Sequence, residues 1–288
     1  MLKVENLSIW FDDRGSMEQA VKGISFSMEK GEILGIVGES GSGKTMTALA
    51  IAGILKKNAV LESGRIEIEE KELLSMTGQQ MRKLQGKEIS MIFQEPMTAL
   101  NPTMQIGRQV EEALLLHEKM TRKERKEKAL EALKDVELEN VETVYKKYPH
   151  ELSGGMRQRV MIAAAVICRP KLLIADEPTT ALDVYTQEEI LKLLKKLNRK
   201  YGMGILFISH NLRVVKELCS RVLVMKDGEI LEEGTAEGLF ASPKTRYTKE
   251  LVEAIPPRQT NSAYYGLFKE KAGGTEWIIA ILMGEVVA

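Results

Sequence analysis

The sequence contains little cysteine and no excess of charge of one sign. Cys168 and Cys219 are the only cysteines in 288 residues, too few for a disulfide framework or a four-cysteine metal site. The 41 lysines and arginines balance the 41 aspartates and glutamates. A neutral chain of this kind argues against a surface whose main task is to bind nucleic acid.

Long apolar runs are also missing. The longest, residues 160–168 and 277–284, have fewer than ten residues each and are too short to cross a bilayer as helices. The opening segment MLKVENLSIWF has no apolar stretch typical of a signal peptide, so we expect the chain to stay in the cytoplasm. A length of 288 residues suits one large α/β domain or two small ones.

The order of expected elements indicates an α/β fold. Strands that alternate with helices of ordinary length predict a largely parallel sheet covered on both faces. A mainly helical stretch, from about residue 96 to 149, interrupts this alternation. Strands are expected at 2–11, 21–28, 32–37, 65–69, 88–93, 172–175, 205–208, 221–225 and 229–232, and helices at 44 to about 58, 106–117, 121–135, 155–168, 186–200 and from about 211.

The segment GESGSGKT at residues 38–45 matches the phosphate-binding pattern G-x-x-x-x-G-K-[ST] and lies between a short apolar strand and a helix. Glycines let the backbone wrap closely around phosphate, and the helix N-terminus attracts negative charge. Lys44 can reach the β- and γ-phosphates, and the Thr45 hydroxyl can coordinate Mg²⁺. A Gly-rich structural turn is the alternative, which this context disfavours. The candidate nucleotide-binding residues are Gly38, Ser40, Gly41, Ser42, Gly43, Lys44 and Thr45.

Two adjacent acids end a second apolar run, LLIADEP at residues 172–178. They are expected at the carboxyl edge of a buried strand, where α/β sheets bind ligands. Asp176 would hold Mg²⁺, directly or through water, and Glu177 is placed to orient or deprotonate an attacking water. Strand-terminal acids also cap helices, but together with the first motif they predict hydrolysis of a nucleoside triphosphate.

A third motif, LSGGM, places Ser153, Gly154 and Gly155 at the start of a helix. Such a run is a plausible second phosphate site at a helix N-terminus. A plain capped helix is an equally good interpretation of these residues alone. If the motif is functional, a symmetric dimer in which each chain covers its partner's nucleotide explains two such sites in one chain.

These motifs together resemble the ATPase subunits of ABC transporters, from about residue 2 to 234. GESGSGKT resembles Walker A, LLIADE resembles Walker B and LSGGM resembles the family signature. The signature's Met156, with MIFQEPMTALNP, is closer to the importers of dipeptides, oligopeptides and nickel. By the same resemblance Gln94 corresponds to the Q-loop glutamine, Asp183 to the D-loop aspartate, His210 to the switch histidine and Phe11 to the aromatic that stacks on adenine.

The resemblance implies a P-loop NTPase (RecA-like) core with an antiparallel β subdomain and an inserted α-helical subdomain. The ATPase domain would be residues 1–235, with the helical subdomain at about 96–155, followed by a C-terminal helix and short tail at 236–288. Two such subunits, identical or related, would close head-to-tail on two ATP molecules with Mg²⁺. Glu177, His210 and Gln94 would act in catalysis, and Thr45, Gln94 and Asp176 at the metal.

The implied partners are a second ATPase subunit, two integral membrane permease subunits and, indirectly, an extracellular substrate-binding protein. The chain would then work at the cytoplasmic face of the cell membrane, without nucleic acid. Peptide, nickel or a metal chelate are all possible cargoes. The alternative is an ABC-type ATPase that acts on the ribosome or on DNA. No cysteine follows Cys219, so the iron–sulfur segment of some relatives should be absent; the tail at 263–288 is expected to form a short hairpin or an interface element.

Overall fold

A computed structural model of the chain describes residues 1–13, 15–93, 99–180 and 182–255. Within it, residues 1–252 form one compact unit. The expected tail hairpin and Gln94 lie outside the described residues. No helix in the described part of the chain is long and apolar enough to cross a membrane.

A six-stranded sheet forms the centre of this unit. Its strand order is β10-β9-β3-β8-β7-β6, and every pairing is parallel except that of β9 with β10. Every residue of β3, β7 and β8 is buried, because their continuous apolar sequences suit strands covered on both faces. The predicted α/β class with a largely parallel sheet is confirmed. The strands are β3 (Ile33–Val37), β6 (Ile89–Ile92), β7 (Leu172–Asp176), β8 (Gly204–Ile208), β9 (Arg221–Lys226) and β10 (Glu229–Thr235).

A second, antiparallel sheet of four strands meets the first through the helix α1 (Lys44–Ala52) and through a direct contact of β2 with β10. The helix α1 contacts β2 of the second sheet and β6 and β7 of the first. Buried side chains from both sheets and from α1 form a single hydrophobic core. The second sheet has the order β2-β1-β4-β5, with β1 (Leu2–Asp13), β2 (Ser16–Met28), β4 (Ala59–Ile68) and β5 (Lys71–Glu72).

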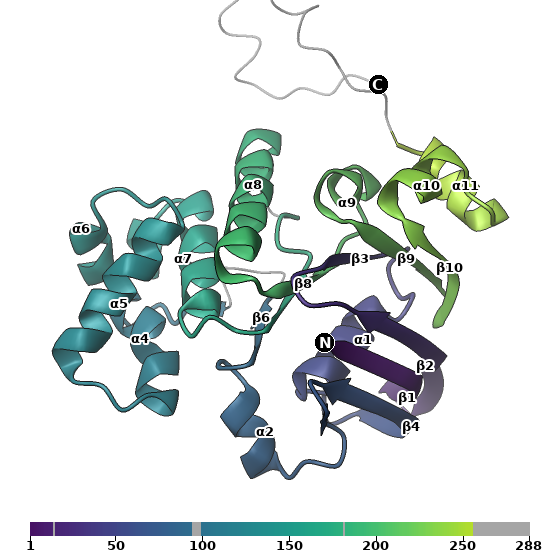
Figure 1. The fold of residues 1–288 in the computed structure, drawn as a ribbon, viewed down its shortest axis with the longest axis horizontal. Helices are drawn as coiled ribbons and strands as arrows, with labels where there is room; N and C mark the ends of the chain where they lie inside the picture. The colour runs from purple at the N-terminus through teal and green to yellow at the C-terminus, as the bar shows by residue number, and fades with distance from the viewer. Residues whose placement is uncertain (14, 94–98, 181, 256–288) are drawn as a thin grey trace, which may run out of the picture. The chain divides into compact units, whose positions relative to one another are not determined.

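The chain between β6 and β7 is helical. In Figure 1 the helices α4, α5 and α6 gather on the side of the six-stranded sheet away from β1, β2 and β4. Contacts of α4 with α5, α6 and α7 hold this group together. The sequence fixes where α5 begins, because Thr121 and Glu124 form a capping box around its first turn. These elements are α4 (Ile106–His117), α5 (Arg122–Asp135), α6 (Val141–Lys146), a 3₁₀ turn at Pro149–Glu151 and α7 (Gly154–Val166).

The remaining helices connect or follow the strands of the central sheet. Helix α9 contacts β3 and α8, and helix α10 contacts β9 and β10. Among the described residues outside the β6–β7 segment, α2 was not expected from the sequence, and α9 was expected only by its start near residue 211. One C-terminal helix was expected after residue 235, where the structure has two, α10 and α11. The helices are α2 (Gly78–Leu84), α8 (Val184–Tyr201), α9 (Leu212–Leu218), α10 (Ala236–Ala241) and α11 (Arg246–Glu253).

The helix α1 ends earlier than its sequence predicts. We expected it to continue to about residue 58, but it stops at Ala52. Gly53 takes a left-handed backbone with φ of 67°, and its N–H donates to the carbonyl of Ala50. The N–H of Ile54 donates to Leu49. A glycine in this conformation terminates a helix before any later stop signal acts.

Close packing of α9 on β3 leaves no room for a side chain at Gly35. A Cβ there would lie 2.7 Å from Val215 Cγ1 and 3.0 Å from Cys219 Sγ. We therefore expect Gly35→Ala to lower the free energy of unfolding by about 1–3 kcal/mol, since overpacking displaces stiff neighbours. Chemical denaturation of the purified chain measures the change. Gly78→Ala is the control, because no atom lies within 4 Å of that position; an equal loss there would contradict the steric explanation.

Candidate functional site

The loop between β3 and α1 has three glycines with positive φ, Gly38, Gly41 and Gly43, and at the first and last of them a Cβ would also collide with backbone. Gly38 has φ of 153°, and a Cβ there would lie 2.1 Å from the carbonyl oxygen of Met225. Gly43 has φ of 96°, and its Cβ would lie 2.4 Å from the carbonyl oxygen of Ala20. The loop is therefore held between β9 and β2, and its glycines are required by space as well as by conformation.

The N-terminus of α1 points its N–H groups into this loop. Gly43 is the N-cap, and among the described residues no side chain caps the first turn. Lys44 is buried, and its Nζ donates to the carbonyls of Gly38 at 2.9 Å and Glu39 at 2.6 Å and to Ser42 Oγ at 3.2 Å. Burial lowers the pKa of Lys44, although the charges of Glu177, Asp176 and Glu39 oppose the change. The loop thus gathers N–H donors and a desolvated ammonium group, which together favour an anion.

Strand register brings the predicted acids and His210 to the same edge. Ile36 of β3 pairs with Ile208 of β8, which in turn pairs with Asp176 of β7. The chain segments that follow these three residues therefore leave the sheet side by side. The N–H of Glu177 donates to the carbonyl of Ile208 at 2.9 Å, which fixes the turn after β7 to the end of β8.

Asp176 faces Thr45 across the gap between β7 and α1. The Thr45 hydroxyl donates to Asp176 Oδ1 at 3.4 Å. Burial raises the pKa of Asp176, and the charge of Glu177 adds to the effect, while Thr45 and Lys44 oppose it. A hydroxyl and a carboxylate beside a phosphate-binding loop form an oxygen donor set of the kind that Mg²⁺ prefers, with water completing its coordination. These two residues therefore fit a magnesium ion.

Glu177 and His210 form a pair at the end of the sheet. Glu177 Oε1 lies 2.9 Å from His210 Nδ1, and Oε2 accepts a bond from the Thr180 hydroxyl at 2.7 Å. Burial alone would raise the pKa of Glu177. The bonds from His210 and Thr180, with the charges of His210 and Lys44, outweigh it and hold the pKa below its ordinary value. Glu177 is thus an ionised carboxylate with a fixed direction.

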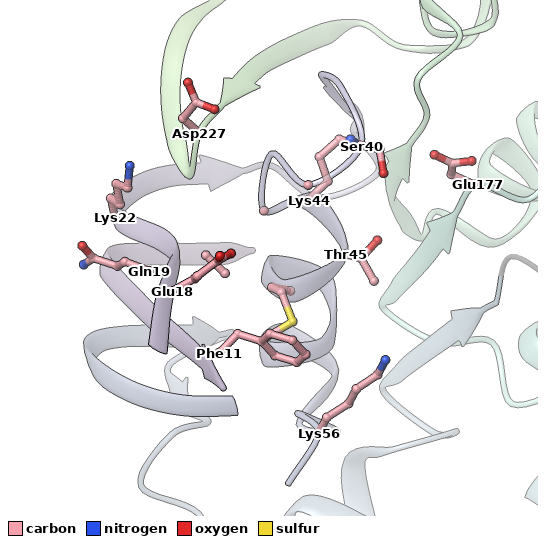
Figure 2. Close-up of a pocket in the computed structure, with 14 residues that line it drawn as sticks. Phe11, Glu18, Gln19, Lys22, Ser40, Lys44, Thr45, Lys56, Glu177 and Asp227 are labelled. Atoms are coloured by element: carbon pink, nitrogen blue, oxygen red, sulfur yellow. The ribbon is translucent and has the colours of Figure 1, made fainter. Parts of the chain in front are cut away.

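The loop and Glu177 border one pocket of about 530 Å³ (Figure 2). In this view Phe11 of β1 and Glu177 lie on opposite sides of Thr45. Asp176 touches Thr45, and His210 reaches the pocket only through Glu177. The predicted residues that line the pocket are Phe11, Ser40, Gly41, Gly43, Lys44, Thr45 and Glu177.

Ser153, Gly155 and Asp183 do not line this pocket. Ser153 caps α7 by accepting a bond from the N–H of Met156 at 3.3 Å, and Asp183 caps α8 through Thr186 at 3.0 Å. The two helix ends pack together, because a Cβ at Gly155 would lie 2.9 Å from Thr186 Cγ2. The second set of predicted residues is therefore a separate cluster on the same chain.

The sequence did not indicate several polar residues of the pocket. They come from β2, from the segment after α1 and from the turn between β9 and β10, and no local motif marks them. Strands were expected at 221–225 and 229–232, but the position of the turn between them at the pocket depends on the pairing of β9 with β3. These residues are Glu18, Gln19, Lys22, Lys56 and Asp227.

Asp176 should cost folding stability at neutral pH. Its folded pKa is raised above the ordinary value of 3.8, so the charged carboxylate is less favourable in the folded chain than in the unfolded one. The cost is complete above the folded pKa, shrinks as pH falls through it and vanishes below the ordinary value. We expect Asp176→Asn to unfold at a higher temperature than the wild type at pH 7.5, with the difference disappearing toward pH 4.

Thermal unfolding of the nucleotide-free chain across this pH range measures the effect. Asp183→Asn is the matched control, because the pKa of Asp183 is lowered by the bond from the Thr186 backbone and Asn also caps helices well. This control should not gain stability. A destabilised Asp176→Asn chain at pH 7.5 would contradict the expected sign.

Comparison with known proteins identifies the family. The sequence model of the ABC transporter family matches residues 21–180, more than half of the chain. The chain is 48% identical to the oligopeptide transport ATP-binding protein AppD of Bacillus subtilis, over 89% of this chain and 78% of that protein. It is 47% identical to the dipeptide transport ATP-binding protein DppD of Haemophilus influenzae, with the same coverage. The glutathione import ATP-binding protein GsiA of Escherichia coli is 46% identical over 89% of this chain and 42% of its own length.

Solved structures agree with the sequence relatives. The dimeric ATP-binding cassette MJ0796 bound to ADP and phosphate has a TM-score of 0.73 and 32% identity, over 82% of this chain and 99% of that one. The cbiO1 subunit of an ABC transporter from Clostridium perfringens has a TM-score of 0.72 and 29% identity, over 94% and 98%. The predicted P-loop fold and the resemblance are confirmed. The chain belongs to the ATP-binding subunits of the ABC transporter family, which bind and hydrolyse ATP.

Proposed function

We propose that the chain energises a membrane importer of peptides, as one of two ATPase subunits that close head-to-tail on ATP. The observation that carries the proposal is Glu177, which lines the same pocket as Lys44 and Thr45 and is held by His210 from outside the lining. Oligopeptide, dipeptide and glutathione transport proteins are among the relatives of this chain, and all three of these cargoes are peptides. The same relatives favour a transporter over the alternative of an ATPase that acts on the ribosome or DNA.

ATP would lie in the pocket with its phosphates on the loop at 38–45. Lys44 would exchange its bonds to the carbonyls of Gly38 and Glu39 for bonds to the β- and γ-phosphates. Ser40, Gly41, Ser42 and Gly43 would contribute the rest of the loop, and Phe11 of β1 would stack on the adenine. Because the first turn of α1 has no side-chain cap among the described residues, its N–H groups suit the phosphate charge.

Magnesium would bind between Thr45 and Asp176, with Gln94 as the third proposed ligand. When bound, it would neutralise phosphate charge and help to orient the terminal phosphate. Gln94 lies outside the described residues, so its place in this set comes from the resemblance alone. The pKa of Asp176, which burial raises, would fall again beside a cation.

Hydrolysis would depend on Glu177 and its histidine. An ionised Glu177 carboxylate can accept a hydrogen bond from the attacking water and orient it toward the γ-phosphate. His210 Nδ1 holds one carboxylate oxygen and Thr180 the other, so that the carboxylate keeps its direction. His210 would also contact the γ-phosphate when ATP is bound. His117 and His150 have no role in this proposal.

The separate cluster of Ser153, Gly154, Gly155 and Asp183 supports a head-to-tail dimer. These residues do not line the pocket of their own chain, yet the resemblance assigns them to a nucleotide site. A dimer in which the N-terminus of α7 covers the ATP of a second subunit would account for both statements. That subunit is a second copy or a related ATPase. The proposed ATPase domain is residues 1–235, with the helical subdomain at about 96–155 inside it.

Replacing Glu177 with glutamine should stop turnover and trap the ATP-bound dimer. Glutamine keeps the shape of the side chain but removes the charge that accepts the water's proton, so we expect the steady-state ATPase rate to fall by about 10²–10⁴-fold. Size-exclusion chromatography with ATP should show a dimer in this variant and a monomer without nucleotide. Wild-type turnover in Glu177→Gln would refute the catalytic role.

A groove beside the helical segment is the proposed docking site for a membrane permease subunit. It has a volume of about 290 Å³ and lies between β6, α4 and α7. Phe93 and Leu116 line it and are 44% and 72% exposed. Apolar side chains exposed beside a groove suit a short helix of a partner protein. The partners would be two integral permease subunits, with an extracellular substrate-binding protein beyond them, and the chain would lie at the cytoplasmic face of the membrane.

A charge in this groove should release the chain from its permease. We expect Leu116→Glu to reduce recovery in the membrane fraction at least tenfold when the chain is co-expressed with the permease subunits of its importer. Leu115→Glu is the matched control, because Leu115 is 61% exposed on the same helix but does not line the groove. Both variants should keep the ATPase activity of the isolated chain. Equal membrane recovery of Leu116→Glu and wild type would contradict this docking site.

A further inference from the structure

A tyrosine near the end of the described chain reaches the phosphate-binding loop. Tyr247 lies in α11, and its hydroxyl accepts a hydrogen bond of 3.1 Å from the backbone N–H of Glu39. The two residues are 208 positions apart in the sequence. Tyr247 is only 7% exposed, so its hydroxyl is largely shielded from water and bonds to the backbone instead. A buried tyrosine hydroxyl needs such a partner.

The position of Tyr247 is fixed from two sides. On one side, Lys226 Nζ lies 4.6 Å from the centre of the tyrosine ring, a favourable cation–π distance. On the other, the Glu232 carboxylate of β10 accepts bonds from the N–H groups of Lys244 and Thr245 at 3.0 Å each. The turn that starts α11 is thereby tied to the central sheet, and the tyrosine ring is held against the end of β9.

Glu39 connects this tyrosine to the lysine of the loop. Its N–H donates to Tyr247, and its carbonyl accepts the 2.6 Å bond from Lys44 Nζ. Glu39 follows Gly38, whose backbone already packs against the carbonyl of Met225 in β9. Burial is the main cause that raises the pKa of Tyr247; the bond from the Glu39 N–H opposes it without reversing it. The phenol therefore stays neutral and can accept the bond.

We infer that Tyr247 is a positioning residue of the nucleotide site. By holding the N–H of Glu39, it fixes the first part of the phosphate-binding loop before nucleotide arrives, so that less conformational entropy is lost on binding. Tyr247 does not line the pocket and acts through the loop backbone. The inference rests on nucleotide binding at this loop. It means that the segment after β10, which lies outside the loop, contributes to ATP affinity.

The test removes only the hydroxyl. Tyr247→Phe keeps the ring, its burial and its contact with Lys226, but leaves the Glu39 N–H without its acceptor. We expect the dissociation constant for ADP and the KM for ATP to rise about three- to tenfold, the size of one neutral hydrogen bond, while kcat stays within twofold. Calorimetric titration of the purified full chain with ADP measures binding without hydrolysis, and steady-state kinetics separate KM from kcat.

The matched control is Tyr201→Phe. Its hydroxyl is also partly buried and donates to Asp135, the last residue of α5, so its loss should lower the unfolding temperature while leaving ADP affinity unchanged. An unchanged ADP affinity in Tyr247→Phe, or an equal loss in both variants, would overturn the inference. Wild-type chain that bound no ADP would instead contradict the nucleotide site itself.

Discussion

The parallel register of β3, β8 and β7 is the constraint on which the rest of the site depends. Ile36, Ile208 and Asp176 are paired across three neighbouring strands, so the segments that follow them leave the sheet at one edge. The phosphate-binding loop, Glu177 and His210 are brought together for this reason, although the loop begins 172 positions before His210 in the sequence. A slip of one residue in any of these strands would turn buried side chains to the opposite face, and would separate the lysine from the acids. Burial of all three strands makes such a slip costly.

The same edge holds charges that the nucleotide-free chain stabilises poorly. Burial lowers the pKa of Lys44 and raises that of Asp176, which means that each group is less favourable when charged than it would be in water. Glu177 is the exception, because His210 and Thr180 bond to its carboxylate. A bound phosphate would stabilise the charged form of Lys44, and a bound cation would stabilise the charged form of Asp176. The buried charge of Asp176 therefore lowers folding stability but favours a bound cation at the same place.

The sequence predicted the parts of the fold that local patterns determine. The helix at 106–117 was predicted with the bounds that the structure has, and the helix predicted at 121–135 begins one residue later, at Arg122. The end of α1 was predicted wrongly, because a left-handed backbone at Gly53 acts before the polar stop signal. Pocket residues such as Lys22 and Asp227 were missed, since they approach through strand pairing rather than through a motif. Tyr247 was missed for the same reason: its contact with Glu39 spans 208 residues.

The two helix N-termini that the sequence marks for phosphate differ in how they are satisfied. Gly43 begins α1 without a side-chain cap among the described residues, whereas the Ser153 side chain already holds the N–H of Met156 at the start of α7. An uncapped N-terminus gains bonds when phosphate arrives, while a capped one must exchange a bond it already has. We therefore expect ATP to bind first at α1 of one subunit, and α7 of the second subunit to join only when the γ-phosphate offers a stronger, charged acceptor. Such an order would make closure of the proposed dimer depend on bound ATP.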